Sequence, residues 1–91
     1  MARTKQEKSE QGSEVVPAQI KMARAALGWG VRELATAAKV SGDTVNRLER
    51  GDPLRERTLA AVRAAIETAG VIFIRENGGG PGVRLKRRGK H

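Results

Sequence analysis

The stretch ELATAAKVSGDTVNRLERG, Glu33 to Gly51, contains two short helical patterns separated by a break of small and polar residues. Apolar residues recur at helical spacing on both sides of the break: Leu34, Ala35, Ala38, Val40, Val45 and Leu48. Ser41 is a good N-cap for the second helix, and Gly51 can end that helix in the left-handed conformation. The stretch therefore predicts two helices joined by a tight turn.

The sequence on either side predicts two more helices and a terminal β-hairpin. Pro17 suits the first turn of a helix that Gly28 can end. The expected helices span 17–27, 31–38, 42–50 and 56–69. After Gly70, VIFIR and VRLKR flank a turn with an Asn-Gly signal, which is typical of a hairpin. The predicted fold class is mainly α, with four helices and a C-terminal β-hairpin.

Composition predicts one small domain with polar ends. We expect a disordered N-terminal tail at 1–16, because TKQEKSEQGSE cannot bury enough apolar area to offset the entropy of ordering. A helical domain at 17–70, a hairpin at 71–87 and a basic tail at 88–91 follow. The chain has no cysteine, no apolar run long enough for a membrane span and no signal peptide core, so we expect a cytoplasmic protein without a cysteine-based metal site.

The charge of the chain indicates an anionic partner. Its 91 residues carry 18 Lys and Arg against 10 Asp and Glu, a formal net charge of +8, and its pI is about 11.1. Nucleic acid is the first partner to consider for such a balance, and an anionic membrane surface is the alternative. RNA is disfavoured, since one Phe and one Trp are too few for a base-stacking platform.

Two short helices joined by a tight turn are typical of a helix-turn-helix, whose second helix can enter the DNA major groove. Burial of Val45 and Leu48 would leave the other residues of this helix facing outward: Gly42, Asp43, Thr44, Asn46 and Arg47. A plain helical hairpin is the alternative interpretation of the same pattern.

The segment from Ile20 to Gly70 resembles the helix-turn-helix domain of the XRE/Cro family, which includes lambdoid phage repressors. The resemblance is carried by Arg24 before LGW, by ELA, by the pattern VS..TV.R.E.G and by TL at the start of the last helix. It implies a sequence-specific regulator, usually a homodimer, and an ion pair between Arg24 and Glu49. The sequence departs from the family in three ways: Gly30 replaces a Ser or Thr cap, Lys39 replaces a turn glycine, and a hairpin replaces a fifth helix.

Side-chain chemistry assigns roles to the candidate DNA-binding residues. Arg47 is the best candidate for base readout, since a guanidinium can bond O6 and N7 of guanine. Asp43 can accept from cytosine, but it more simply favours the helix N-terminus through the helix dipole. Thr44 and Asn46 can contact base, sugar or phosphate. The remaining candidates are expected at the DNA backbone, with a solvated charge as the alternative for the arginines: Val31, Arg32, Ser41, Gly42 and Arg50.

The hairpin is predicted to make a twofold dimer by joining its strands to those of a second copy, because an isolated two-stranded hairpin is marginal in water. Its other expected arrangement is packing on its own helices only. The dimer would present two recognition helices to half-sites about one helical turn apart. Basic residues at its margin are candidates for flanking DNA contacts: Lys86, Arg87, Arg88 and Lys90.

Enzymatic chemistry is not indicated by the sequence. His91 is the sole histidine and stands at the end of the chain, and GGGPG lacks the Gly-Lys-Ser/Thr ending of a phosphate-binding loop. We expect no metal and no cofactor. An antitoxin-like or protein-interaction module that binds DNA for autoregulation is the alternative to a simple transcriptional regulator.

Overall fold

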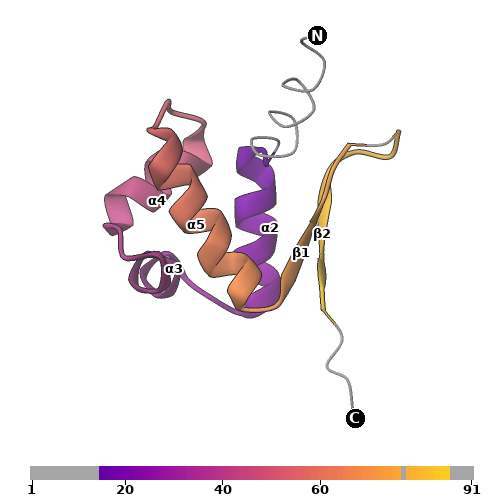
Figure 1. Ribbon diagram of the computed structural model, residues 1–91, viewed down its shortest axis with the longest axis horizontal. Coiled ribbons are helices and arrows are strands. Elements are labelled where there is room, and N and C mark those ends of the chain that lie inside the picture. The colour runs from indigo at the N-terminus through magenta and orange to yellow at the C-terminus, as the bar shows by residue number, and fades with distance from the viewer. Residues whose placement is uncertain (1–14, 77, 87–91) are drawn as a thin grey trace, which may run out of the picture.

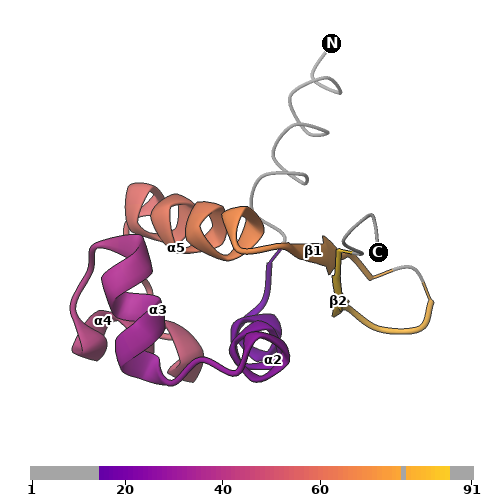
Figure 2. The ribbon, with the colours of Figure 1, turned by 90° about the horizontal axis from the view of Figure 1, so that it is seen from below.

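The computed structural model describes residues 15–76 and 78–86. Within these residues, four helices precede the strands: α2 (Pro17–Leu27), α3 (Val31–Ala38), α4 (Gly42–Arg50) and α5 (Glu56–Thr68). An antiparallel hairpin of β1 (Val71–Ile74) and β2 (Gly82–Leu85) follows. The predicted fold class, mainly helical with a C-terminal hairpin, is confirmed. Figures 1 and 2 show α2 and α5 in the middle of the molecule, with α3 and α4 on one side and the hairpin on the other.

The helices α2, α3 and α4 end where the chain enters the left-handed region. Gly51 has φ 88°, where a residue without Cβ avoids strain, and its N–H bonds the Leu48 carbonyl. Lys39 ends α3 with φ 60°, so a non-glycine residue does adopt a positive φ in the turn. The last helix ends at Thr68, one residue before the prediction, and Ala69 is its C-cap.

The core is small and consists of short aliphatic side chains from all four helices and β1. Its fully buried members include Leu34 from α3, Val45 from α4, and Val62 and Ile66 from α5. Leu59 of α5 is exposed, so it is not part of this core. Trp29 is partly buried and packs against the core.

The hairpin packs on both central helices. In its register, Val71 lies opposite Leu85 and Phe73 opposite Val83, so these four residues share one face. Val71 is buried, and Phe73 and Val83 pack against the core, while Ile72 is exposed on the opposite face. The hairpin contacts α2 through both strands and α5 mainly through β1, so two helices support it (Figure 2).

Gln19 provides the polar connection between α2 and the hairpin. Gln19 is 1% exposed and is the one buried polar residue among those that the structure describes. Nε2 donates to the carbonyl oxygens of Ile74 (3.0 Å) and Gly82 (2.8 Å), and Oε1 accepts from the backbone N–H of Val16 (2.9 Å). One amide therefore satisfies three backbone groups of two strands and a helix N-terminus. Nothing in the sequence analysis identified this residue.

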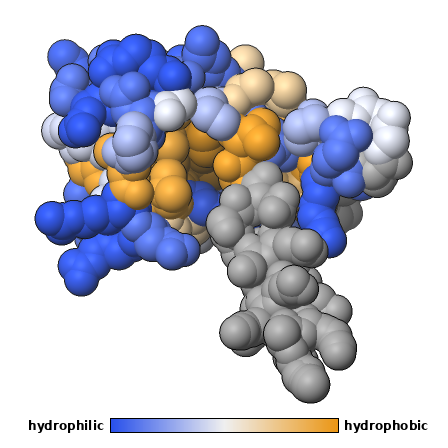
Figure 3. Space-filling view, turned by 90° about the horizontal axis from the view of Figure 1, so that it is seen from above, coloured by the Kyte–Doolittle hydropathy of each residue, from blue (hydrophilic) through white to orange (hydrophobic). Residues whose placement is uncertain are grey.

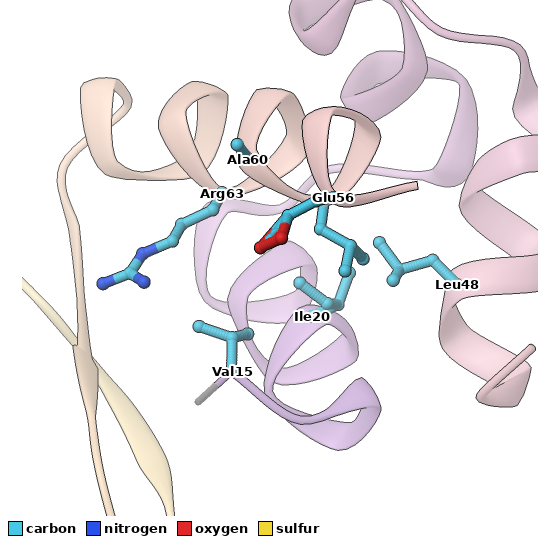
Figure 4. Close-up of a pocket in the computed structure, with 7 residues that line it drawn as sticks. Val15, Ile20, Leu48, Glu56, Ala60 and Arg63 are labelled. Atoms are coloured by element: carbon cyan, nitrogen blue, oxygen red, sulfur yellow. The ribbon is translucent and has the colours of Figure 1, made fainter. Parts of the chain in front are cut away.

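A small apolar cleft opens between α2, α4 and α5. Its volume is about 70 Å³, and its lining residues are Val15, Ile20, Leu48, Glu56, Leu59, Ala60 and Arg63. Val15, Ile20 and Leu48 point toward its centre in Figure 4. Figure 3 shows apolar surface here between hydrophilic regions on both sides. Because Val15 also packs against the core, the contacts of the folded unit reach into the predicted tail at 1–16. Residues 1–14 of that tail lie outside the described part of the chain.

We predict that Gln19→Met lowers the free energy of unfolding by about 1–3 kcal/mol, because the Ile74 and Gly82 carbonyls lose their shared donor. Urea unfolding followed by circular dichroism measures the change. Lys21→Met, at an exposed position of the same helix, is the matched control and should change stability by less than about 0.5 kcal/mol. Equal effects of the two substitutions would contradict a structural role for the Gln19 amide.

Candidate nucleic-acid interface

The start of α4 is fixed by the turn and by a side-chain cap. Ser41 Oγ accepts from the Thr44 N–H at 3.0 Å, which is the bond expected of an N-cap serine. The end of α3 is closed by bonds from the N–H groups of Lys39 and Val40 to carbonyls of its last turn. An ideal Cβ on Gly42 would lie 3.6 Å from Val31 Cγ1, so the N-termini of α3 and α4 lie side by side. Backbone donors at both ends can therefore serve one stretch of phosphates.

The start of α3 lacks a side-chain cap on Gly30, but Glu33 supplies a substitute. Its Oε1 accepts from the Gly30 N–H at 2.8 Å, three residues back. This bond is the carboxylate half of a capping box. An acidic residue in the first turn also complements the helix dipole.

One face of α4 is buried and the other is open. Val45 and Leu48 are buried against the core, which fixes how the helix lies on the body. Asp43, Asn46 and Arg50 are exposed. Gly42, Thr44 and Arg47, which the sequence analysis also expected to face outward, are only partly exposed, and the Arg47 side chain is 43% exposed.

An ion pair ties the end of α4 to α2. Arg24 Nε lies 2.7 Å from Glu49 Oε2 and Nη2 lies 2.9 Å from Oε1, a bidentate arrangement. Arg24 Nη1 also donates to the Trp29 carbonyl at 3.2 Å. The side chains are 21% and 7% exposed, and hydrogen bonding to Glu49 raises the pKa of Arg24 above its ordinary value. The two residues that the resemblance pairs are thus in direct contact.

Three further residues beside α4 were missed by the sequence analysis. Asp52 accepts from Arg50 Nη2 at 2.9 Å, and the same oxygen lies 3.9 Å from Arg47 Nε. Arg55 and Thr58 join Thr44 and Arg47 along a shallow groove between α4 and the start of α5. The charged run after Gly51 was the available signal in the sequence. Only the fold shows that this segment lies beside α4.

The predicted flanking residues lie apart from α4. Lys86 is exposed at the end of β2, and α2 and α5 separate the hairpin from α4 in both ribbon views. Within one protomer Lys86 therefore does not extend the surface of α4. Arg87, Arg88 and Lys90 lie outside the described residues, as does His91.

The described part of the chain gives little support for a metal site or a membrane-spanning helix. No group of three His, Cys, Asp or Glu residues within 15–76 and 78–86 could hold a metal ion. In the same residues, no helix is long and apolar enough to cross a membrane. The cleft between α2 and α5 is apolar apart from Glu56 and Arg63.

Comparison with known proteins gives one family match. A family model described as a helix-turn-helix domain matches residues 15–71, a range that includes all four helices. The family consists of XRE-like helix-turn-helix DNA-binding domains. No curated protein matches the chain.

We predict that Arg24→Met destabilises the protein by about 3–5 kcal/mol, because the largely buried Glu49 carboxylate is left without its partner. Thermal unfolding followed by circular dichroism measures the effect. Arg57→Met, at an exposed position of α5, is the control and should leave the melting temperature nearly unchanged. A loss below about 1 kcal/mol for Arg24→Met would place the pair among exposed ion pairs of little importance.

Proposed function

We propose that this chain, which belongs to the helix-turn-helix domain family, is a sequence-specific transcriptional regulator of the Cro/C1 type that reads the major groove of double-stranded DNA with α4. Domains of this family bind DNA and are typically not enzymes. Three properties are proposed beyond DNA binding: the groove that is read, the helix that reads it and the regulatory role. A regulator of this kind acts where the DNA is, which in a bacterial cell is the cytoplasmic nucleoid.

The observation that carries the proposal is the arrangement of α4. Its apolar face is buried, its last turn is tied to α2 by the Arg24–Glu49 pair, and its opposite face presents polar and basic side chains. A helix fixed in this way can enter a groove without losing its orientation. The net charge of +8 favours DNA over an uncharged partner.

The exposed and partly exposed residues of α4 suit different kinds of contact. Arg47 is the proposed reader of guanine, with a bidentate bond to O6 and N7. Asn46 can bond adenine in the same bidentate manner, and Thr44 can reach a base or a phosphate. Asp43 lies in the first turn of α4, where it complements the helix dipole.

The N-termini of α3 and α4 are proposed phosphate contacts. The N–H groups near Val31 and Gly42 carry positive partial charge and lie close together. Ser41, Arg32 and Arg50 flank this region and are exposed, so each can contact the DNA backbone. These contacts would position the domain without carrying sequence information.

The hairpin is the proposed dimer contact. Ile72 is exposed on its outer face, Leu85 is half exposed at its end, and each strand has a free edge. Joining two hairpins would pair the free edges and bring apolar side chains of the two copies next to each other. Because α2 and α5 lie between the hairpin and α4, the two reading helices of such a dimer are well separated, and half-sites a whole number of helical turns apart would fit them. Lys86, Arg87, Arg88 and Lys90 are the proposed flanking DNA contacts of such a dimer.

Arg47→Ala is expected to cost about 1–3 kcal/mol of binding free energy on a duplex selected by the wild-type protein from a random-sequence pool, because one bidentate base contact is lost. Affinity for a scrambled duplex should change little. Fluorescence anisotropy at several salt concentrations measures both, and wild-type affinity should fall with a log-log slope of about −0.9 per phosphate contact.

Arg75→Ala is the matched control, since Arg75 is an exposed arginine beside the hairpin and away from α4. It should keep the preference for the selected duplex. Failure of the wild-type protein to select any sequence would contradict the proposed function, and an equal loss on both duplexes would make Arg47 a phosphate contact.

Ile72→Glu is expected to weaken dimerisation at least tenfold, because it places a charge on the outer face of the hairpin. Light scattering at tens of micromolar protein gives the oligomeric state. Met22→Glu, which changes an exposed apolar residue on α2, is the control and should remain dimeric. A wild-type monomer under these conditions would rule out the hairpin dimer.

A further inference from the structure

Asp52 lies beside two arginines of α4 because of the turn that ends this helix. Gly51 adopts φ 88°, and the next N–H, that of Asp52, donates to the Arg47 carbonyl at 3.0 Å. This bond returns the chain to the last turn of α4. The Asp52 carboxylate consequently lies next to the side chains of Arg47 and Arg50 rather than in open solvent.

The two arginines contact the same carboxylate oxygen in different ways. Arg50 Nη2 donates to Asp52 Oδ2 at 2.9 Å, which is a hydrogen bond. Arg47 Nε lies 3.9 Å from that oxygen, too far for a hydrogen bond but within ion-pair distance. The Arg47 and Arg50 side chains are 43% and 59% exposed, so the cluster adds little to stability. The cluster instead influences where the charged groups of Arg47 and Arg50 lie.

We propose that Asp52 is a positioning residue that orients Arg47 for base readout and thereby raises the sequence specificity of DNA binding. The inference rests on the proposed function, because it assigns Asp52 a part in the same reading surface. The Asp52 oxygen approaches Arg47 at Nε, and no hydrogen bond within the described residues engages the terminal nitrogens of Arg47. Those two nitrogens are left free for the paired acceptors of guanine.

A carboxylate at this position has a second effect, of opposite sign. It lies on a surface that approaches phosphates, so it repels every DNA sequence equally. Asp52 therefore lowers affinity for any duplex while restricting the orientation of the one side chain that reads a base. Proteins commonly gain specificity in this way, by disfavouring the wrong partners as well as by favouring the right one.

This pair of effects gives Asp52→Asn a distinctive signature. The probes are the duplex that wild-type protein selects from a random 20-bp pool and a scrambled duplex of the same composition. Asp52→Asn should bind the scrambled duplex about twofold to fivefold more tightly and should reduce the ratio of selected to scrambled affinity about tenfold. Asp52→Ala should do the same, and Asp52→Glu, which restores the charge, should recover part of the ratio.

Two controls separate positioning from charge. Glu56→Gln removes the same charge four residues further on, at an exposed site that forms no ion pair with Arg47 or Arg50, and should leave the ratio unchanged. In an Arg47→Ala background, Asp52→Asn should also leave the ratio unchanged, because the side chain that it positions is gone. Melting temperatures of all variants, measured in parallel, should stay within a few degrees of the wild type.

The outcomes distinguish this inference from the proposed function. If the wild-type protein selects no sequence, the proposed function itself fails. If it selects a sequence but Asp52→Asn tightens both duplexes by the same factor, DNA reading stands and the positioning role is overturned. A loss of specificity that persists in the Arg47→Ala background would also overturn it.

Discussion

The bidentate ion pair between Arg24 and Glu49 is the constraint on which the arrangement of the helices depends. It joins the last turn of α2 to the last turn of α4. Both side chains are largely buried, so each charge requires the other. Arg24 Nη1 bonds the Trp29 carbonyl as well and so fixes the connection into α3. A single arginine thus holds three helices in one geometry.

A polar tie of this kind has particular weight in a core as small as this one. Several buried contacts between helices are made by alanines, which bring the helices close together but bury little apolar area: Ala23, Ala35 and Ala38. Directional bonds then define the geometry that packing alone specifies weakly. Gln19 does for the hairpin what Arg24 does for α4, since its amide bonds carbonyls of both sides of the hairpin. Both residues lie on α2, which makes this helix the common support.

The surface around α4 combines positively charged groups with one carboxylate that contacts two of the arginines. The N-termini of α3 and α4, which lie side by side, and the arginines of α4 supply positive charge around this helix. Asp52 introduces a negative charge among them and contacts two of the arginines. A purely attractive surface would bind all DNA alike, whereas a reader of sequence needs side chains held in fixed positions. The fixed positions of the side chains on this surface are therefore as relevant to function as its net charge.

Local sequence determined the elements. Ser41 specified the start of α4, Gly51 its end, and the apolar period of each segment its buried face, because caps, turns and periodicity act between residues a few positions apart. The resemblance added the Arg24–Glu49 pair, which periodicity alone would not identify. Tertiary structure alone decided that Gln19 bonds the hairpin, that the hairpin rests on α2 as well as on α5, and that Asp52 lies beside Arg47. These contacts depend on where separate elements meet in space. The sequence around a polar residue does not indicate which distant group its side chain will contact.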